Sequence, residues 1–444
     1  MANTKNPKVC TLLSEHFGNI PVHELVTATR EFPITTRLDL QAALETGLTG
    51  EFQPEKFVGI HVQYGHETIT MAHLTVDNDH CALVAPLQYD EMDNGAAQPL
   101  RCLKNGLWTC RSKGLPFTVM LSRVNQFGRE GGVHLEIAVP PGEAGLLLSQ
   151  RLLMEIEKKI GQAGSYRGKV LSLEASDNYR GGAKGIKVHK LRSVRREDVI
   201  LPEKTLALLE RNVTQFIAQR EKLRAMSLGV KKGLLFYGPP GTGKTHTIHY
   251  LASQMKEQTT LLITAEQVGY LDQYMQLARF LQPAMVVLED VDLIAKARTS
   301  MNSPCEESLL NKLLNEMDGL REDAMILFVL TTNRPEQLEA ALASRPGRVD
   351  QAIEFPMPDD EGRHKLVRLY SGGLQVSEEL ARFIVHKTKN GSAAFIKELM
   401  RRAAQFFIES GENSLTEKHL ESALDEMLFS GGTLNAKLLG VNQE

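Results

Sequence analysis

The fold is decided by residues 238–245, Gly238-Pro239-Pro240-Gly241-Thr242-Gly243-Lys244-Thr245, which have the complete G-x-x-x-x-G-K-[ST] spacing. The apolar run 234–237 directly before them predicts a strand. A glycine-rich loop after a strand turns successive backbone N–H groups toward one anion, and the positive end of the following helix adds to the attraction. This stretch therefore predicts a nucleotide phosphate loop in an α/β domain.

Two side chains of this loop carry chemistry of their own. Lys244 is expected to reach the β and γ phosphates as a point charge, and the Thr245 hydroxyl is expected to ligate the magnesium ion between them. The other residues of the loop contribute mainly backbone N–H groups. The predicted cofactors are therefore ATP and Mg2+.

A pair of carboxylates follows another expected strand. The apolar run 285–288 leads directly into Glu289 and Asp290. One carboxylate is expected to hold the hydration shell of the magnesium ion, and the other to orient or deprotonate the attacking water. We assign Glu289 to the magnesium ion and Asp290 to the attacking water. The alternative without function is that the two carboxylates are an ordinary polar end of a strand.

Length and composition limit the class of protein. A chain of 444 residues is too long for one core, and its 42% hydrophobic and 24% charged content is that of a globular protein. A net charge of -3 argues against wholesale coating of nucleic acid. No stretch has the apolar length that a bilayer span needs, so we expect a cytoplasmic protein. The five cysteines form no C-x-x-C pair, which supports neither a disulfide framework nor a zinc site.

The hydrophobic period changes along the chain and predicts several domains. Residues 57–139 alternate as half-buried strands and 146–160 have helical spacing, which predicts an α+β domain over 1–178. We expect this domain to recognise a client. Residues 197–357 alternate strands and helices in the manner of a parallel sheet with crossover helices. The expected strands there are 234–237, 260–263, 285–288, 325–330 and 352–355. Four helical patterns over 358–430 predict a C-terminal helical lid, and 431–444 remain as a tail.

A basic, glycine-rich stretch over 179–196 separates the first two domains and is expected to be a linker. The interpretation without a binding function is a solvated strap or a set of ion pairs to the next domain. The alternative is a contact with nucleic acid or phosphate. No aromatic residues interleave with the basic ones for base stacking, so we favour the strap.

Four motifs in order resemble the AAA+ ATPases, and more narrowly the AAA clade with its spastin-like, proteasomal and Rieske-protein-translocating members. They are the phosphate loop, the acidic strand end, Thr331-Thr332-Asn333, and the Ser344–Asp350 stretch, Ser-Arg-Pro-Gly-Arg-Val-Asp. The resemblance covers about residues 197–430, whereas 1–178 resemble no family that we can name. The implied fold is a P-loop parallel sheet followed by a helical lid.

The resemblance implies further site residues. Asn333 becomes the sensor that positions water, while Arg345 and Arg348 become arginine fingers that reach a neighbouring subunit's site. Near the nucleotide, Val199 and Ile200 fall where the family wraps the adenine. Gly391 and Ser392 open the lid helix that covers the nucleotide. The implied assembly is a homo-oligomeric ring, expected to be a hexamer.

One departure from the family qualifies the functional expectation. Members usually place Asp before Glu at the acidic strand end, whereas here Glu289 precedes Asp290, as in the Rieske-translocase branch. We expect an ATP-hydrolysing motor that remodels, unfolds or disassembles protein clients. A slow, nucleotide-gated scaffold is the first alternative, and a ring that acts on nucleic acid is the second.

Overall fold

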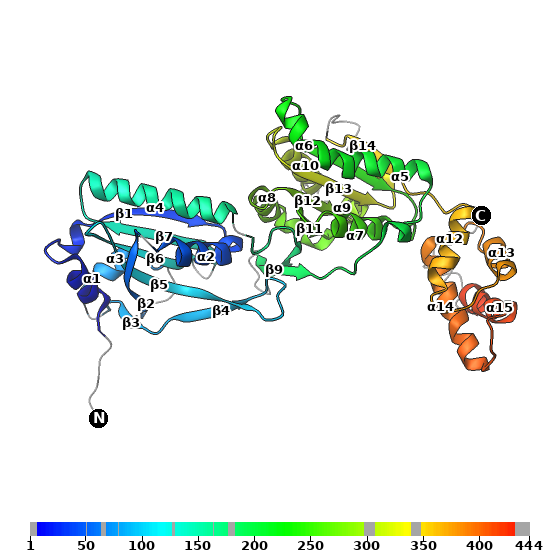
Figure 1. Ribbon diagram of the computed structural model, residues 1–444, viewed down its shortest axis with the longest axis horizontal. Helices are drawn as coiled ribbons and strands as arrows, with labels where there is room; N and C mark the ends of the chain where they lie inside the picture. The colour runs from blue at the N-terminus through cyan, green and yellow to red at the C-terminus, as the bar shows by residue number, and fades with distance from the viewer. Residues whose placement is uncertain are drawn as a thin grey trace. The chain divides into compact units, whose positions relative to one another are not determined.

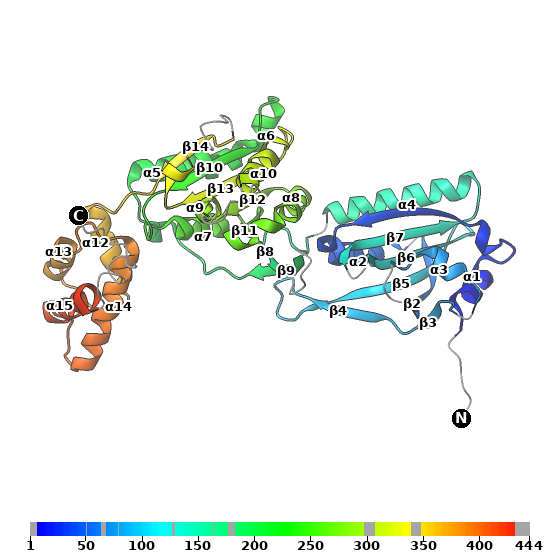
Figure 2. The same cartoon turned by 180° about the vertical axis from the view of Figure 1, so that it is seen from behind.

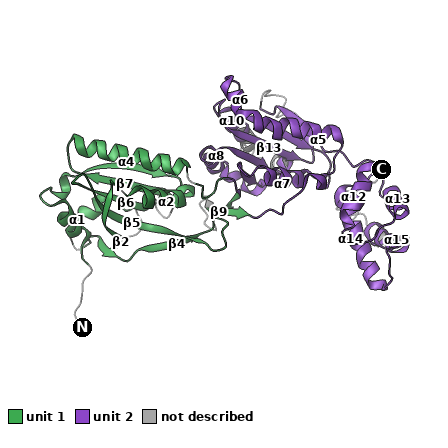
Figure 3. Cartoon of the chain, in the orientation of Figure 1, with its two compact units in different colours: residues 1–167, 171–189 green, residues 168–170, 190–444 purple. Residues whose placement is uncertain are grey.

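The computed structural model describes residues 7–49, 51–63, 68–78, 80–126, 129–162, 164–175, 183–296, 307–338 and 348–430. The chain divides into two compact units, which are coloured separately in Figure 3. Unit 1 contains residues 1–167 and 171–189. Unit 2 contains residues 168–170 and 190–444. The expected tail, 431–444, lies outside the described residues.

Unit 1 is built on an antiparallel sheet (Figure 1). The strand order is β1 (Val26–Phe32), β7 (Arg129–Val139), β6 (Leu115–Gln126), β5 (Leu100–Ser112), β2 (Gln53–His61) and β3 (Leu83–Ala85), with β4 (Gln88–Met92) paired to β5. Its helices are α1 (Val9–Phe17), α2 (Arg37–Gly47), α3 (Met71–Thr75) and α4 (Glu143–Gln162), and β8 (Val170–Ala175) and β9 (Ala183–His189) follow them. Helix α4 packs on β7 and β1, and α2 on β5.

The sheet of unit 1 is covered on both faces at β7, where the sequence predicted a half-buried strand. Every residue of 132–139 is buried, including His134 and Glu136 on the polar side of the alternation. Glu136 Oε2 accepts a hydrogen bond of 2.7 Å from the backbone N–H of Met71, the first residue of α3. The N–H group at the start of α3 provides a hydrogen-bond donor for this carboxylate. The polar residues of β7 can therefore lie on a buried face of the sheet.

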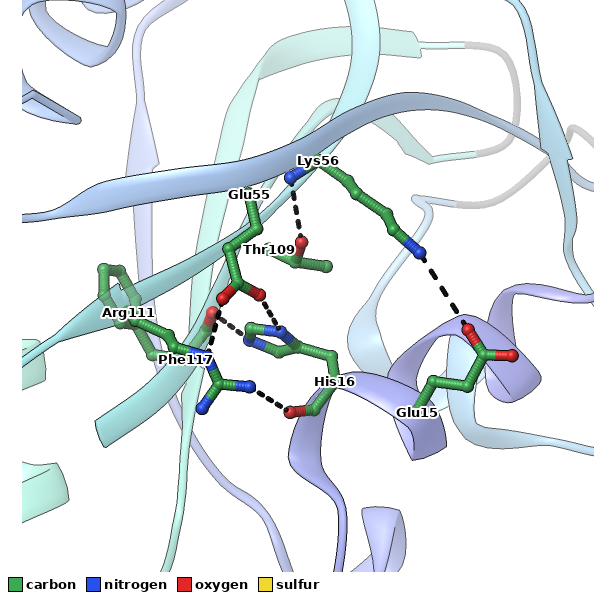
Figure 4. A network of polar contacts seen from close by, with 7 residues as sticks. All are labelled: Glu15, His16, Glu55, Lys56, Thr109, Arg111 and Phe117. Atoms are coloured by element: carbon green, nitrogen blue, oxygen red, sulfur yellow. Dashed lines mark hydrogen bonds and ion pairs between the residues drawn. The ribbon is translucent and has the colours of Figure 1, made fainter. Parts of the chain in front are cut away.

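A polar network fastens α1 to the same sheet (Figure 4). His16 Nδ1 lies 3.0 Å from Glu55 Oε2, and His16 Nε2 lies 3.1 Å from the carbonyl oxygen of Phe117. Arg111 Nε donates to the other oxygen of Glu55 at 2.6 Å. Burial opposes ionisation of Glu55, but Arg111 and His16 outweigh it and lower the pKa of this carboxyl. The buried His16 ring therefore connects α1 with Glu55 of β2 and with Phe117 of β6.

Residues 183–189 form strand β9, whereas the sequence predicted a linker over 179–196. Within the strand, Ile186 is buried, the basic Lys187 is exposed and Val188 is half-buried. The glycines and basic residues around this short alternation concealed it, because they lower the mean hydropathy of the whole stretch. Residues 179–182 lie outside the described part of the chain.

Unit 2 begins with a parallel sheet, as predicted. Its strands lie in the order β14 (Gln351–Glu354), β10 (Lys232–Tyr237), β13 (Ile326–Thr332), β12 (Ala284–Leu288) and β11 (Thr259–Ile263). The helices of this part are α5 (Glu203–Leu209), α6 (Phe216–Ala225), α7 (Lys244–Gln254), α8 (Leu271–Phe280), α9 (Val291–Lys296) and α10 (Glu307–Asp318). Strands β12 and β13 are buried at every residue, as expected for parallel strands covered on both faces.

The helical lid follows the sheet (Figure 2). It contains α12 (Asp360–Tyr370), α13 (Glu378–Lys387), α14 (Ala393–Ser410) and α15 (Glu417–Asp425), which correspond to the four helical patterns predicted over 358–430. Asp359, Ser377 and Ser392 accept hydrogen bonds from the first turns of α12, α13 and α14 as N-caps. In the described residues, no helix has the length and apolar character that a membrane span requires.

Candidate functional site

The phosphate loop joins β10 to α7 with three glycines in the left-handed region. The φ angles are +144° at Gly238, +76° at Gly241 and +101° at Gly243. A Cβ added at Gly238 would lie 2.2 Å from the carbonyl oxygen of Phe355. Only glycine adopts these φ angles without strain. The three glycines therefore allow the backbone of the loop to curve around a central space.

Lys244, the first residue of α7, occupies the interior of this loop. Its side chain is largely buried, with the residue 7% exposed, and Nζ donates to the carbonyl oxygens of Gly238 at 2.7 Å and Pro239 at 2.9 Å. Burial lowers the pKa of Lys244 to about 8, against the opposing effect of Asp290 and Asp292. The Lys244 ammonium group therefore lies at the centre of the loop. It is hydrogen-bonded to carbonyl oxygens that a phosphate oxygen can replace.

This lowered pKa predicts a pH dependence of nucleotide binding. In the free protein, Lys244 carries its charge below pH 8 and loses it above, so ATP affinity is expected to fall as the pH rises from 7.5 to 9. Bound phosphate stabilises the ammonium, so binding above pH 8 takes up a proton. Calorimetry in two buffers of different ionisation enthalpy measures this uptake. Constant affinity over that range, without proton uptake, would contradict the assignment.

Asp290 lies at the end of β12, beside the phosphate loop. Its backbone N–H donates to Thr331 Oγ1 at 3.0 Å, and Asn333 Nδ2 donates to Asp290 Oδ1 at 3.1 Å. Asp290 has φ +51°, a left-handed conformation that costs a non-glycine residue about 1–2 kcal/mol. Such strain persists where neighbouring groups fix the residue, and here two residues at the end of β13 do so.

Asp292 forms hydrogen bonds with residues at the end of β13. This residue is 3% exposed, and its Oδ1 accepts from Thr332 Oγ1 at 2.9 Å and from the backbone N–H of Asn333 at 3.2 Å. The side chain of Asn333 is thereby aimed at Asp290. The sequence analysis assigned no role to Asp292, although its place two residues after Asp290 is a usable signal for these contacts.

Replacing Asp292 with alanine is expected to disturb both stability and turnover. It leaves the Thr332 hydroxyl and the Asn333 N–H without their buried acceptor, which costs about 1–3 kcal/mol of unfolding free energy. ATP turnover is expected to fall about 10-fold or more, because a small misplacement of Asn333 is enough. Urea unfolding and phosphate release measure the two effects, with the exposed Asp272→Ala as a control. Unchanged turnover would exclude the positioning role.

Glu289 lies in surroundings different from those of Asp290. Its Oε1 atom is buried without a hydrogen-bond partner, and its backbone N–H donates to the Ile263 carbonyl oxygen at 3.0 Å. Burial lowers the pKa of His249, and Glu289 opposes this effect, which places the two side chains near one another. The two consecutive carboxylates therefore have different surroundings.

A cavity of about 380 Å³ lies over the phosphate loop. Among the predicted nucleotide-binding residues it is lined by Val199, Ile200 and residues 240–245, and among the predicted catalytic residues by Asp290 and Asn333. Glu289 and Arg348 do not line it, and neither do Gly238, Pro239, Gly391 and Ser392. The volume is in the range of small-molecule sites, and acidic, basic and amide groups converge on one end.

The lid closes one side of this cavity through the start of α14. The backbone N–H of Ala394 donates to the carbonyl oxygen of Gly241 at 3.1 Å. A Cβ at Gly241 would lie 2.8 Å from Ser392 Oγ. Gly241 therefore serves both the curve of the loop and its close contact with the lid, and Ser392 lies behind the loop as the N-cap of α14.

Comparison with known proteins identifies this arrangement. The family model described as "ATPase family associated with various cellular activities (AAA)" matches residues 234–357, from the strand before the phosphate loop to the hinge before the lid. This stretch is an AAA ATPase domain. The phosphate loop, the acidic strand end and Asn333 all lie within it, whereas unit 1 lies outside the match.

Three relatives are 27–29% identical to this chain over the aligned residues. The ATP-dependent zinc metalloprotease FtsH of Thermus thermophilus is 29% identical over 49% of this chain and 37% of its own length. Proteasome-activating nucleotidase of Methanosphaerula palustris is 29% identical over 56% of this chain and 63% of its own. The same-named protein of Methanococcus vannielii is 27% identical over 72% and 81%. The chain therefore spans less than two thirds of the first two relatives.

Sequence reasoning also missed residues that the lid adds to the AAA domain's cavity. These missed residues are Leu366, Ala394 and Lys397. Tyr370 of α12 lines the same cavity. Burial raises the pKa of Tyr370, and Asp198 adds to the shift. Lys397 follows Ala393 and Ala394 by one helical turn, so the signal for it was helical spacing from the predicted start of α14.

Of the two predicted arginine fingers, the structure describes only Arg348, which does not line the cavity. Arg345 falls outside the described residues. The side chain of Arg348 is 9% exposed, and its Nη2 forms an ion pair with Asp318 and lies 3.4 Å from Asn315 Oδ1. Arg348 lines a separate cavity of about 270 Å³ with Lys232 and other residues. Its action on a neighbouring subunit stays a prediction.

Proposed function

We propose that this chain hydrolyses ATP with Mg2+ in a ring of identical subunits, expected to be a hexamer, and uses the cycle to remodel protein clients. The observation that carries the proposal is the convergence of Lys244, Asp290 and Asn333 on one cavity. The names of the relatives support a link with proteins as substrates, because they describe a protease and an activator of the proteasome.

The residues present fit the proposed cofactors. Three positive-φ glycines form the cradle for a triphosphate, and Lys244 supplies its cation. A magnesium ion is usually held by one or two protein oxygens together with the phosphates, and the described residues contain no cluster of three or more metal-ligating side chains. Thr245 lines the cavity. Glu289 directly precedes the cavity-lining Asp290 in the chain, and its buried Oε1 has no hydrogen-bond partner. When bound, the ion neutralises charge on the phosphates.

The chain's own groups then divide the remaining work. Lys244 leaves the Gly238 and Pro239 carbonyl oxygens and holds phosphate oxygens instead. Asn333 occupies Oδ1 of Asp290, so Oδ2 is left to accept a hydrogen bond from water and to take its proton. The lid covers the site through Ala394 and excludes bulk water. Val199 and Ile200 line the same cavity and suit the apolar faces of an adenine ring.

Unit 1 is proposed as the client-recognition part. We keep the division into 1–178, the linker 179–196, the AAA core 197–357 and the lid 358–430 as a proposal about function. Compact unit 1 extends to residue 189, so the folded part of the first region is longer than this division assumes. A folded unit separate from the ATPase domain is a suitable place for client specificity, because its sequence can vary to bind different clients while the ATP site stays the same.

The ring is tested through Arg345 and Arg348. Replacing both with alanine is expected to lower turnover about 10³-fold or more, since an arginine finger acts mainly on the charge that grows in the transition state. ATP binding is expected to change little. Phosphate release and titration with a fluorescent ATP analogue measure the two, and the exposed Arg321→Ala is the matched control. Undiminished turnover in the double variant, or full activity in a monomer, would overturn the ring mechanism.

A slow, nucleotide-gated scaffold is the second candidate. The observation that favours it is the position of Glu289, whose side chain lies outside the cavity that Asp290 lines. A motor is expected to turn over at about 0.1–10 per second, the lower part of the usual enzyme range. Steady-state phosphate release well below that range, with intact ATP-dependent assembly, would favour the scaffold.

A further inference from the structure

Two segments of unit 1 that are far apart in the sequence pair at the start of α1. Lys8 forms an antiparallel bridge with Leu83, and the backbone N–H of Val9 donates to the carbonyl oxygen of Ala82 at 2.9 Å. The side chains of Val9 and Ala82 are both buried in the same apolar cluster. The residue after Val9 and the residue before Ala82 are therefore brought to the same place in the fold.

These two residues are cysteines. Each step of an antiparallel pairing moves one residue forward in one segment and one residue back in the other, so the register leads to Cys10 and Cys81. Directly opposed residues have Cα atoms about 4.5–5.5 Å apart, which suits the ~4.4–6.8 Å of a disulfide. Cys10 lies in the first turn of α1, whose first hydrogen bond, from the Leu12 N–H to the Lys8 carbonyl oxygen, is long at 3.3 Å. This turn can therefore adjust to a cross-link.

The ammonium group of Lys8 lies near both thiols. Its hydrogen bond with Asp77, at 2.6 Å, is the largest of the effects that raise the pKa of Lys8. The charge of Asp77 and the negative charges of Cys81 and Cys10 add to the shift. A lysine cation attracts a thiolate, which is the form of cysteine that attacks a disulfide. Cys81 is half-buried and Cys10 is 7% exposed, so a reagent in solution reaches Cys81 first.

The two other cysteines of the described residues are different. Cys102 and Cys110 both lie on β5 and are 0% exposed. Burial raises the pKa of Cys102 to about 11 and that of Cys110 to about 12. Both therefore stay protonated and unreactive near neutral pH, and they serve as internal references. Cys305 lies outside the described residues.

We propose that Cys10 and Cys81 are a site of reversible oxidation, at which a small disulfide such as oxidised glutathione joins the two thiols. After losing its proton to water, the Cys81 sulfur attacks one sulfur of the small disulfide, so a mixed disulfide forms and one glutathione thiolate leaves. The Cys10 sulfur, also deprotonated by water, then attacks the Cys81 sulfur and releases the second glutathione. Two protein thiols are oxidised, and one small disulfide is reduced to two thiols.

This disulfide fastens the N-terminal end of α1. The C-terminal end of the helix is already held, because His16 contacts Glu55 and Phe117 (Figure 4). Oxidation therefore fixes both ends of α1 and encloses residues 10–81 in one covalent loop, which restricts the unfolded chain and stabilises unit 1. A reducing compartment opens the bond again, so its state follows the thiol–disulfide balance around the protein. The ATP site takes no part in this reaction.

The test incubates the reduced full chain with oxidised glutathione, alkylates the remaining thiols and digests the protein without reductant. Mass spectrometry is expected to find the Cys10–Cys81 cross-linked peptide, and dithiothreitol is expected to remove it. The variant Cys10→Ser lacks the resolving thiol and is expected to retain glutathione on Cys81 at least 10-fold more than the unaltered chain does. The control Cys102→Ala is expected to form the cross-link as the unaltered chain does. Absence of the cross-link, or glutathione that stays on Cys81 in the unaltered chain, would overturn the proposal.

Hydrogen exchange tests the consequence for α1. Oxidation of the unaltered chain is expected to slow amide exchange in residues 9–17 at least 10-fold, whereas in Cys81→Ser oxidised glutathione is expected to leave it unchanged. ATP hydrolysis by the two reduced proteins is expected to be equal. The same exchange of α1 in the oxidised and reduced states of the unaltered chain would show that the bond does not fasten the helix.

Discussion

Replacing Lys244 with alanine is expected to lower ATP turnover by about 10²–10³-fold or more and to remove most of the affinity for ATP. Lys244 is the one side chain of the phosphate loop whose cation is buried among the loop's own carbonyl groups. Its loss leaves the triphosphate with backbone N–H groups alone. The remaining dipoles of the loop and of α7 do not replace a full charge at short range.

Titration with a fluorescent ATP analogue and a phosphate-release assay measure the two losses for Lys244→Ala. The matched control is Lys256→Ala, which removes an exposed lysine from the turn after α7. The fold is expected to tolerate both changes, and circular dichroism checks this. Retention of ATP affinity within about 3-fold in Lys244→Ala would show that the loop does not hold the phosphates in the way proposed.

The sequence was sufficient for the AAA domain because its signals are local. The G-x-x-x-x-G-K-[ST] spacing requires positive φ at set positions, and the structure has them at Gly238, Gly241 and Gly243. Apolar runs bounded by polar turns predicted the five strands β10 to β14 to within two residues at each end. The starts of α13 and α14 also have a local signal, because Ser377 and Ser392 accept hydrogen bonds from the first turns of these helices as N-caps.

The remaining features depend on contacts between distant segments. Nothing local to Glu289 and Asp290 says which carboxylate turns toward Lys244, since that depends on the positive φ of Asp290 and on Thr331 and Asn333 from another strand. The ion pair of Arg348 with Asp318 is equally non-local. In unit 1, the burial of Glu136 depends on α3, whose Met71 lies 65 residues away in the chain.

Asp290→Asn is expected to lower ATP turnover by about 10²–10⁴-fold, the usual contribution of a general base, while ATP binding changes less than about 3-fold. Asparagine keeps an oxygen that accepts from Asn333, and it adopts the left-handed conformation of this position more readily than most residues. The change therefore removes the charge and the proton-accepting capacity with little effect on the fold. Single-turnover hydrolysis with pre-bound ATP separates the chemical step from binding.

The neighbouring Glu289→Gln is the matched control, because it also converts one carboxylate of the pair into an amide. If Glu289 serves the metal side, its replacement is expected to raise the Mg2+ concentration needed for half-maximal turnover and to reduce the maximal rate less than Asp290→Asn does. The geometry supports this order, since Asp290 lines the cavity and Glu289 does not. A larger loss of maximal rate in Glu289→Gln at saturating Mg2+ would reverse the two assignments, and Glu289 would then have to turn toward the cavity when ATP binds.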